Sequence, residues 1–508
     1  MDNNKNKRAF LFFVFSLIIA YSSTIAAKEI TKKNTTVAPI APALAQTHFI
    51  DDYDSNASPN TLPDSVLSLL KKYKIPADNL SIYVRDLNKA KPMLAHNIDK
   101  IRAPASTMKL LTTYAALKIL SPSYSWRTEA WIRGELKNGV LQGDLILKGY
   151  GDPFLSYENY WKFIRGIREK GLKDIQGDII IDNSYFEPID FDPAAFDNKP
   201  FRTYNAPPSA LMFNFQSTRF LFTPDAETKT VKVTPYPSIP NFQFENKITY
   251  TDKKCRRSHY RPKFGFDKKG LLSIKGKYSL KCGQKFILRS FSTPEDHAFN
   301  GFRDFWHELG GTLRGSMKKG KVVSSDKRFH VSSSPTLGEQ IRLINKWSNN
   351  VMTRQVLLTL GAKVYGAPAT LQKGQDAIID LLTKNNINTS GIIIDNGSGL
   401  SRKSRISARQ MAQLLEIAYR DPYMPEFMAS LSLPGLDGTL VNRFRRDDLR
   451  GRSHLKTGTL NNVTAIAGYM LNRKGKRLVI VIQHNGKKTG RGRGVKIQNA
   501  LLRWSFEQ

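Results

Sequence analysis

The chain has 508 residues, enough for about three domains at roughly 150 residues each. Apolar residues make up 40% of it and aromatic residues 10%, which excludes a mainly disordered chain. Its 78 Lys and Arg against 43 Asp and Glu give a net charge of +35, so charge alone favours an anionic partner: nucleic acid, acidic lipid or an envelope polymer.

The N-terminus has the pattern of a secretory signal peptide over residues 1–27. Basic residues up to Arg8 precede the apolar run Ala9–Ala20, and small residues follow up to Ala27. The alternative is an uncleaved membrane anchor, but the run is shorter than the roughly 17–25 residues that span a bilayer. We therefore expect cleavage and a soluble periplasmic protein, held peripherally at most, with no nucleic-acid partner.

Residues 28–61 lack apolar periodicity and are rich in Thr, Ala, Pro and Asn, which predicts a flexible leader. Folded structure is expected from residue 62, and residues 62–133 form the first part of a main domain. The elements expected in it are a helix around Val66–Leu70, a strand at Leu80–Arg85, its hairpin partner at Pro92–His96 and a buried helix at Ser106–Leu120.

Residues 134–329 change character to short strand-like runs separated by Pro, Gly and Lys, which predicts inserted β-rich accessory domains. Residues 330–508 return to a mixed pattern and form the second part of the main domain. The elements expected there are helices at Thr336–Leu360 and Ala408–Tyr419, sequential antiparallel strands at Ser453–Gly458, Val463–Leu471 and Leu478–Gln483, and a final helix. The fold class predicted is α+β.

The only two cysteines, Cys255 and Cys282, both lie in the insert. An oxidising compartment would permit them to form a disulfide, and two buried free thiols are the alternative. Neither has the neighbours expected of a nucleophile or a zinc ligand. His307-Glu308 runs into Gly311 where a metalloprotease helix needs a second histidine, so no metal or other cofactor is expected.

A serine followed three residues later by a lysine places both side chains on one helical face, where a neutral amine can take the hydroxyl proton. Chance supplies most such pairs in this chain, which begin at Ser68, Ser106, Ser316, Ser324 and Ser453. The pair Ser106 and Lys109 stands apart because it opens an apolar helix, where burial lowers the pKa of the lysine. We therefore expect Ser106 to be a nucleophile and Lys109 its base.

Two further motifs follow in chain order. Ser348-Asn349-Asn350 lies in a helical stretch, and Lys456-Thr457-Gly458 ends a strand that leads into a hairpin. A second Lys-Thr-Gly at 488–490 lies in a basic glycine-rich loop and is interpreted as chance. The three motifs together match the S-x-x-K, S-x-N and K-T-G triplet of penicillin-binding proteins and serine β-lactamases.

From residue 62 to the C-terminus the chain resembles the class C low-molecular-mass penicillin-binding proteins, peptidase family S13, of the penicillin-binding protein 4 type. Besides the triplet, the segments that resemble this family are Gly151–Pro153, Tyr204–Leu211, Asp395–Arg402, Leu436–Leu440 and Ala467–Tyr469. The resemblance implies a catalytic domain of the penicillin-binding and β-lactamase type, with an antiparallel sheet flanked by helices. It also implies that the insert holds extra domains.

The resemblance implies a D-alanyl-D-alanine carboxypeptidase and endopeptidase. Ser106 would attack the peptide carbonyl and pass its proton to Lys109. Ser348 and Lys456 would relay a proton to the leaving amine, and Asn350 would hold Lys109 and the substrate amide. Backbone N–H groups, by resemblance those of Ser106 and Thr459, would hold the oxyanion.

The resemblance places the remaining site residues around the substrate. Thr457, Gly458 and Thr459 line it from the strand, with Thr457 at the terminal carboxylate. Ser398 and Arg402 line the acyl pocket, the alternative being a tight turn with a surface arginine, and Asp197 is the nearest candidate for contact with the diamino acid.

The expected partners are peptidoglycan stem peptides and β-lactams, with anionic envelope polymers as a further candidate. The competing interpretation is a catalytically silent protein that binds peptidoglycan or envelope polymers through the same pocket.

Overall fold

A computed structural model describes residues 61–238, 244–266, 271–490 and 492–508. The predicted signal peptide and, except for Thr61, the predicted leader lie outside the described residues. Within these ranges no helix has both the length and the apolar content needed to cross a membrane.

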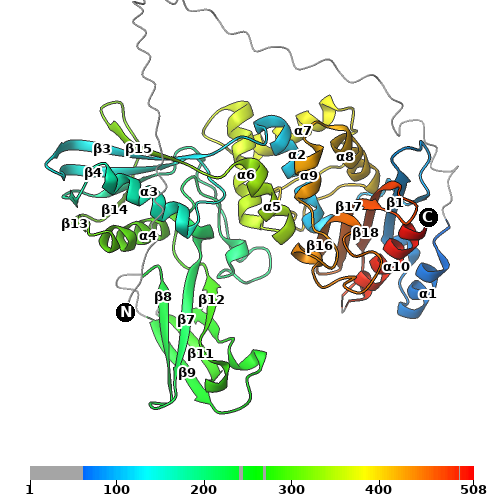
Figure 1. Cartoon of the computed structure of the whole chain (residues 1–508), viewed down its shortest axis with the longest axis horizontal. Coiled ribbons are helices and arrows are strands. Elements are labelled where there is room, and N and C mark those ends of the chain that lie inside the picture. The colour runs from blue at the N-terminus through cyan, green and yellow to red at the C-terminus, as the bar shows by residue number, and fades with distance from the viewer. Residues whose placement is uncertain (1–60, 239–243, 267–270, 491) are drawn as a thin grey trace, which may run out of the picture. The chain divides into compact units, whose positions relative to one another are not determined.

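One antiparallel sheet of five strands organises the main domain, in the order β16-β17-β18-β1-β2 (Figure 1). Its strands are β1 Leu80–Asp86, β2 Leu94–His96, β16 Ser453–Leu460, β17 Val463–Leu471 and β18 Arg477–Asn485. β1 pairs with β18 so that Tyr83 lies opposite Val481, which joins the two parts of the domain in one sheet. The expected α+β class and the three predicted hairpins are confirmed.

Helices cover both faces of this sheet because successive side chains of a strand point to opposite faces. Tyr83 and Val481 pack into a core with most of the helices, whereas Ile82 and Ile480 pack on the other face with α1 and α10. The helices of this domain are α1 Asp64–Tyr73, α2 Lys109–Leu120, α5 Leu337–Trp347, α6 Asn350–Tyr365, α7 Leu371–Lys384, α8 Ala408–Arg420, α9 Met424–Ala429 and α10 Arg493–Glu507.

The helical pattern predicted at Thr336–Leu360 is confirmed, and it forms two helices, α5 and α6. Ser348 ends α5 in the left-handed conformation (φ 58°), and Asn349 starts α6 by accepting a hydrogen bond from the backbone N–H of Met352 at 3.1 Å. Helix α7 has an amphipathic pattern that the sequence analysis did not single out. The interruption between α5 and α6 at Ser348 therefore places the Ser348-Asn349-Asn350 motif at a helix junction.

The insert contains a seven-stranded mixed sheet packed against two helices. Its elements are β3 Arg127–Lys137, β4 Val140–Gly149, α3 Tyr157–Glu169, β5 Asp174–Ile175, β6 Ile179–Asp182, α4 Pro294–Glu308, β13 Thr312–Leu313, β14 Met317–Lys319 and β15 Lys327–Ser333. Both predicted domain boundaries, 133/134 and 329/330, fall inside β3 and β15, which pair with each other. We propose boundaries at the outer ends of those two strands.

A smaller β-rich part of the insert has two three-stranded sheets around a compact aromatic core. Its strands are β7 Thr218–Asp225, β8 Thr230–Tyr236, β9 Phe244–Thr251, β10 Lys263–Phe266, β11 Leu272–Ser279 and β12 Lys285–Arg289. Cys255 and Cys282 form a disulfide beside this core, with their Cα atoms 4.9 Å apart. Within the described ranges, short 3-10 helices lie at Ala77–Asn79, Ala105–Met108, Thr203–Asn205, Phe213–Gln216, Arg257–His259, Leu280–Cys282 and Gly438–Leu440.

We expect the substitution Leu501→Ala in α10 to lower the free energy of unfolding by about 2–5 kcal/mol. Leu501 is fully buried between α10 and the sheet, so its removal leaves a cavity. The matched control is Leu67→Ala on α1, whose side chain is 41% exposed and whose loss should change stability by less than about 0.5 kcal/mol. Chemical denaturation followed by circular dichroism measures both, and equal effects would contradict the assignment of this core.

Candidate active site

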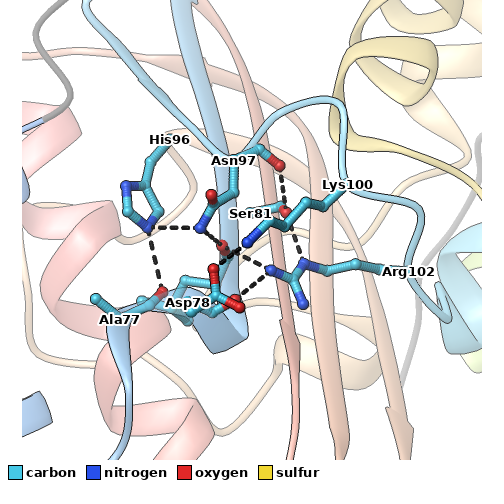
Figure 2. A network of polar contacts seen from close by, with 8 residues as sticks. Ala77, Asp78, Ser81, His96, Asn97, Lys100 and Arg102 are labelled. Atoms are coloured by element: carbon cyan, nitrogen blue, oxygen red, sulfur yellow. Dashed lines mark hydrogen bonds and ion pairs between the residues drawn. The ribbon is translucent and has the colours of Figure 1, made fainter.

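A network of polar contacts fixes the segment that leads into Ser106 (Figure 2). The guanidinium of Arg102 donates to Ser81 Oγ at 2.6 Å and to the carbonyl oxygens of Asp78 and Leu80 at 2.5 and 3.1 Å. These bonds tie the chain four residues before Ser106 to the start of β1. The approach to Ser106 is therefore held by buried groups.

Ser106 lies in the 3-10 turn Ala105–Met108, which runs directly into α2. Ala105 has a left-handed backbone (φ 48°), which turns the chain sharply just before the serine. Residues three apart eclipse one another in a 3-10 turn, so the side chains of Ser106 and Lys109 lie on one side. Ser106 is half-buried and Lys109 fully buried.

The Lys109 amine is surrounded by oxygen atoms. Its Nζ donates to Asn350 Oδ1 and to the carbonyl oxygen of Ser398, both at 2.6 Å, and lies 3.3 Å from Ser106 Oγ. The two closer groups only accept hydrogen bonds, so they take two N–H groups. A neutral amine held in this way has its lone pair left for the hydroxyl of Ser106.

Burial is the main cause that lowers the pKa of Lys109 well below its usual value. The positive charges of Lys456 and Arg354 lower this pKa further. All three effects favour the neutral amine, which is the form that accepts a proton. The pair therefore has the arrangement that a nucleophile and its base would need.

The other two predicted motifs meet this pair from separate elements. Ser348, at the junction of α5 and α6, accepts a hydrogen bond at its Oγ from Lys456 Nζ at 3.0 Å. Asn350, the first residue of α6, reaches Lys109. Because the backbone at Ser348 is left-handed, Ser348 contacts Lys456 while Asn350, two residues later, contacts Lys109.

Lys456 is fully buried on β16, and its Nζ also donates to the carbonyl oxygen of Thr457 at 3.0 Å. Thr457 Oγ1 donates to Thr439 Oγ1 at 2.8 Å, which links β16 to the segment Gly438–Leu440. Thr457 and Thr439 therefore place two hydroxyl groups side by side next to Lys456.

The outer edge of β16, on the side away from β17, presents backbone N–H groups. β16 is the edge strand, and Leu455 uses its outer N–H and C=O to pair with Ser432. Backbone groups of alternate residues in a strand point to the same side, so the N–H groups of Thr457 and Thr459 also point outward. Thr459 lines the same cleft as Ser106.

Two glycines allow backbone to approach the Ser106 turn. A Cβ on Gly458 would lie 2.8 Å from the Ser106 nitrogen and 2.7 Å from the Pro104 oxygen. Gly399 has φ +72°, and a Cβ there would lie 1.8 Å from the Ala105 oxygen. Only glycine fits at either position without displacing the turn.

The mouth of the cleft, about 690 Å³ in volume, is lined partly by the insert. The guanidinium of Arg402 lies 4.9 Å from the ring centroid of Phe196. Asp197 also lines the cleft, but its two carboxylate oxygens accept from Tyr204 Oη at 2.7 Å and Asn205 Nδ2 at 2.9 Å. The predicted residues Arg402 and Asp197 therefore both lie at the cleft, with Asp197 already bonded to its own loop.

Ser398 enters the site in a different way from the one predicted. Its hydroxyl is fully buried, donates to Asn396 Oδ1 at 2.8 Å and accepts from the backbone N–H of Leu400 at 3.2 Å. The carbonyl oxygen of Ser398 is the group that contacts Lys109. In this structure the hydroxyl is bonded inside its own loop, and its contact with a ligand stays a prediction.

Arg354 is a site residue that the sequence analysis missed. It is buried on α6, and its Nη1 donates to the carbonyl oxygens of Tyr204 and Ala206 at 3.1 and 3.0 Å. It thereby ties α6 to the insert segment at the cleft mouth, and its charge acts on Lys109. The available signal was an arginine one helical turn after Asn350 in a helix whose other charged residue, Lys363, lies in the last turn.

We expect Lys456 to make stability depend on pH. Burial lowers its pKa from 10.5 to about 7, so between these values the unfolded chain binds a proton that the folded chain does not. The free energy of unfolding therefore rises with pH in this window, by up to about 1.4 kcal/mol per pH unit from this group, and the contribution is flat below it. Lys456→Met should remove that rise.

Denaturation between pH 6 and 10 measures this effect as the difference between the wild-type protein and the variant. The exposed Lys474, in the turn between β17 and β18, offers the control Lys474→Met, which should keep the wild-type slope. A Lys456→Met variant with an unchanged slope would mean that Lys456 is charged in the folded protein.

Comparison with known proteins gives the following matches. A family model described as the D-Ala-D-Ala carboxypeptidase 3 (S13) family matches residues 62–508. The D-alanyl-D-alanine carboxypeptidase DacB of Haemophilus influenzae is 24% identical over 427 residues, 82% of this chain and 88% of that protein. The D-alanyl-D-alanine carboxypeptidase of Actinomadura sp. (strain R39) is 27% identical over 403 residues, 75% of this chain and 73% of that protein.

Two solved structures support the fold. Penicillin binding protein 4 of Haemophilus influenzae matches with a TM-score of 0.74 at 22% identity, covering 88% of this chain and 100% of that one. A second structure of that protein, complexed with a β-lactam, matches with a TM-score of 0.70 at the same identity and coverage. The expected penicillin-binding fold, insert included, is confirmed.

Proposed function

The chain belongs to the D-Ala-D-Ala carboxypeptidase 3 (S13) family, and from that premise we propose that it is a serine-type D-alanyl-D-alanine carboxypeptidase with endopeptidase activity on peptidoglycan. The observation that carries the proposal is the contact between Ser106 and Lys109. Burial favours the neutral amine, two acceptors occupy its N–H groups, and its lone pair is left for the serine hydroxyl.

Acylation begins when Ser106 Oγ attacks the carbonyl carbon between two D-alanines and its proton passes to Lys109 Nζ. The oxyanion is held by the backbone N–H groups of Ser106 and Thr459, which Gly458 lets approach each other. Collapse of the tetrahedral intermediate breaks the C–N bond and leaves an ester on Ser106.

The departing amine of D-alanine needs a proton, and the proton that Lys109 took from Ser106 reaches it through the hydrogen-bonded pair Lys456 and Ser348, which leaves Lys109 neutral again. Water then attacks the ester, with Lys109 again as base, and the free Ser106 hydroxyl returns. The same groups serve both reactions: the leaving amine belongs to a terminal D-alanine in the carboxypeptidase reaction and to a diamino acid in the endopeptidase reaction.

Substrate recognition uses the rest of the cleft. The adjacent hydroxyls of Thr457 and Thr439 suit the terminal carboxylate of the peptide. Arg402 and Asp197 are the charged groups at the mouth that suit the stem and its diamino acid. β-Lactams, which mimic the D-alanyl peptide, acylate Ser106. The site of action is the periplasm, in agreement with the signal-like N-terminus and the disulfide.

The test is a mass spectrum of the protein after incubation with benzylpenicillin, followed by a D-alanine assay with a stem peptide ending in D-Ala-D-Ala. We expect a covalent adduct on Ser106 and release of D-alanine, both absent in Ser106→Ala. A purified cross-linked peptide dimer tests the endopeptidase reaction. A folded sample with neither adduct nor product would instead support the silent wall-binding protein.

A further inference from the structure

The insert contains a second cavity, of about 670 Å³, that the proposed catalytic steps do not use. It lies between strands β10 and β12 and the chain segment 198–202. The described residues that line it include no Asp or Glu and five cationic side chains: Lys199, Arg202, Arg261, Lys263 and Arg289. Such a concentration of one sign of charge favours an anionic ligand.

Most of these charges have no counter-charge within the part of the chain that the structure describes. Among the residues that the structure describes, Lys199 lies 3.9 Å from Asp197, and no carboxylate forms an ion pair with the other four cations. Arg289 is half-buried with its guanidinium 4.6 Å from the ring centroid of Phe264. Burial, with repulsion from Arg202 and Arg261, lowers the pKa of Arg289 to about 10. An anion among these groups would relieve that repulsion.

The cavity also has an apolar side. Phe286 and Leu288 of β12 are 59% and 41% exposed and line it beside Arg289. A guanidinium group is planar and binds a carboxylate through two parallel hydrogen bonds, and aromatic faces accept apolar groups. The lining therefore suits a ligand that carries carboxylates on an otherwise uncharged framework, such as an acidic peptide.

This cavity and the catalytic cleft share a wall. Lys199 lines both, and the neighbouring Asp197 belongs to the cleft. Tyr204, which donates to Asp197, is influenced from both cavities: burial and the Asp197 carboxylate raise its pKa, whereas Arg202 and Arg289 lower it. A substrate that leaves the cleft along this wall reaches the arginines directly.

We propose that this basic cavity binds carboxylate groups of the peptidoglycan strand whose stem peptide occupies the catalytic cleft. The inference rests on the proposed function and extends it, because it assigns part of the insert to recognition of the polymer beyond the scissile bond. Short peptides, which end within the cleft, do not reach the cavity. The cavity thus favours polymeric substrate over small peptides.

The test measures binding without catalysis. In the Ser106→Ala background, sedimentation with purified insoluble peptidoglycan gives the affinity of the full chain. We expect the triple substitution Arg202→Ala, Arg261→Ala, Arg289→Ala to weaken binding at least tenfold. The control substitution removes three exposed lysines elsewhere, Lys71, Lys72 and Lys384, and should change binding less than twofold. Peptidoglycan can also be changed by converting its carboxylates to amides. The protein with all three arginines should bind this amidated peptidoglycan as weakly as the triple variant binds native peptidoglycan.

Equal losses in the arginine and lysine variants, or unchanged binding of amidated peptidoglycan, would overturn the proposal. Tight binding of polyphosphate that depends on the arginines, together with unchanged binding of amidated peptidoglycan, would assign the cavity to phosphate polymers instead.

Because Arg289 packs on Phe264, the double variant Arg202→Ala, Arg261→Ala is tested beside the triple one. Each variant is also made with Ser106 intact, where acylation by benzylpenicillin reports the fold. Absence of acylation in the unsubstituted protein would count against the proposed function and not against the cavity.

Discussion

Replacing Lys109 by alanine is expected to slow acylation of Ser106 by benzylpenicillin by about 10²–10⁴-fold. The amine lies 3.3 Å from Ser106 Oγ and is the nearest base in the site, and without it the hydroxyl must lose its proton to water. The measurement is the rate of adduct formation by mass spectrometry between pH 5 and 9. In the wild-type protein the rate should rise with pH as Lys109 becomes neutral, and this rise should be absent in Lys109→Ala.

The control for this prediction is Lys118→Ala on the same helix, whose side chain is partly exposed and paired with Asp421 at 2.7 Å. It should leave the rate within about twofold, because it lies two helical turns or more from the serine. A Lys109→Ala protein that acylates at the wild-type rate with the same pH profile would exclude Lys109 as the base.

Replacing Gly458 by alanine is expected to slow acylation by about 10²–10³-fold, the cost of losing one oxyanion donor. The added Cβ would lie 2.8 Å from the Ser106 nitrogen and 3.0 Å from the Ala105 Cβ. Backbone cannot yield as a flexible side chain does, so β16 must move away from the Ser106 turn. The N–H groups of Ser106 and Thr459 then no longer converge on one oxygen atom.

The matched control is Gly265→Ala in strand β10 of the insert, where a Cβ meets nothing within 4 Å. Adduct formation with benzylpenicillin is measured for both variants, together with their thermal unfolding. A Gly458→Ala protein that acylates within twofold of Gly265→Ala would show that close approach of β16 is not needed for the oxyanion site.

The sequence alone predicted the elements whose signal is local. The strands of the central sheet alternate or run apolar between clear turns, so their order along the chain and the three hairpins could be predicted. The three motifs also identified five groups that the fold brings together around one cleft: Ser106, Lys109, Ser348, Asn350 and Lys456. Chemistry of this kind is visible in a sequence because each motif has a short, fixed spacing.

Contacts between distant segments leave no local signal in the sequence. The separation of helix α5 from helix α6 at Ser348 depends on a left-handed turn, which the apolar periodicity of the sequence does not reveal. Ser398 acts through its carbonyl oxygen, a group that every residue has and no motif marks. Arg354 matters because the insert segment at Tyr204 packs against α6, and no local pattern predicts which segment lies there.

The sequence by itself therefore determined the fold class, the central hairpins and the pairing of Ser106 with Lys109, since these follow from periodicity and from spacing within one element. Tertiary structure alone decided how far the pKa values of Lys109 and Lys456 are lowered, because these values depend on burial among residues from both parts of the chain. It also decided that segment 196–204 of the insert lines both the catalytic cleft and the basic cavity, since only packing places one segment between two cavities.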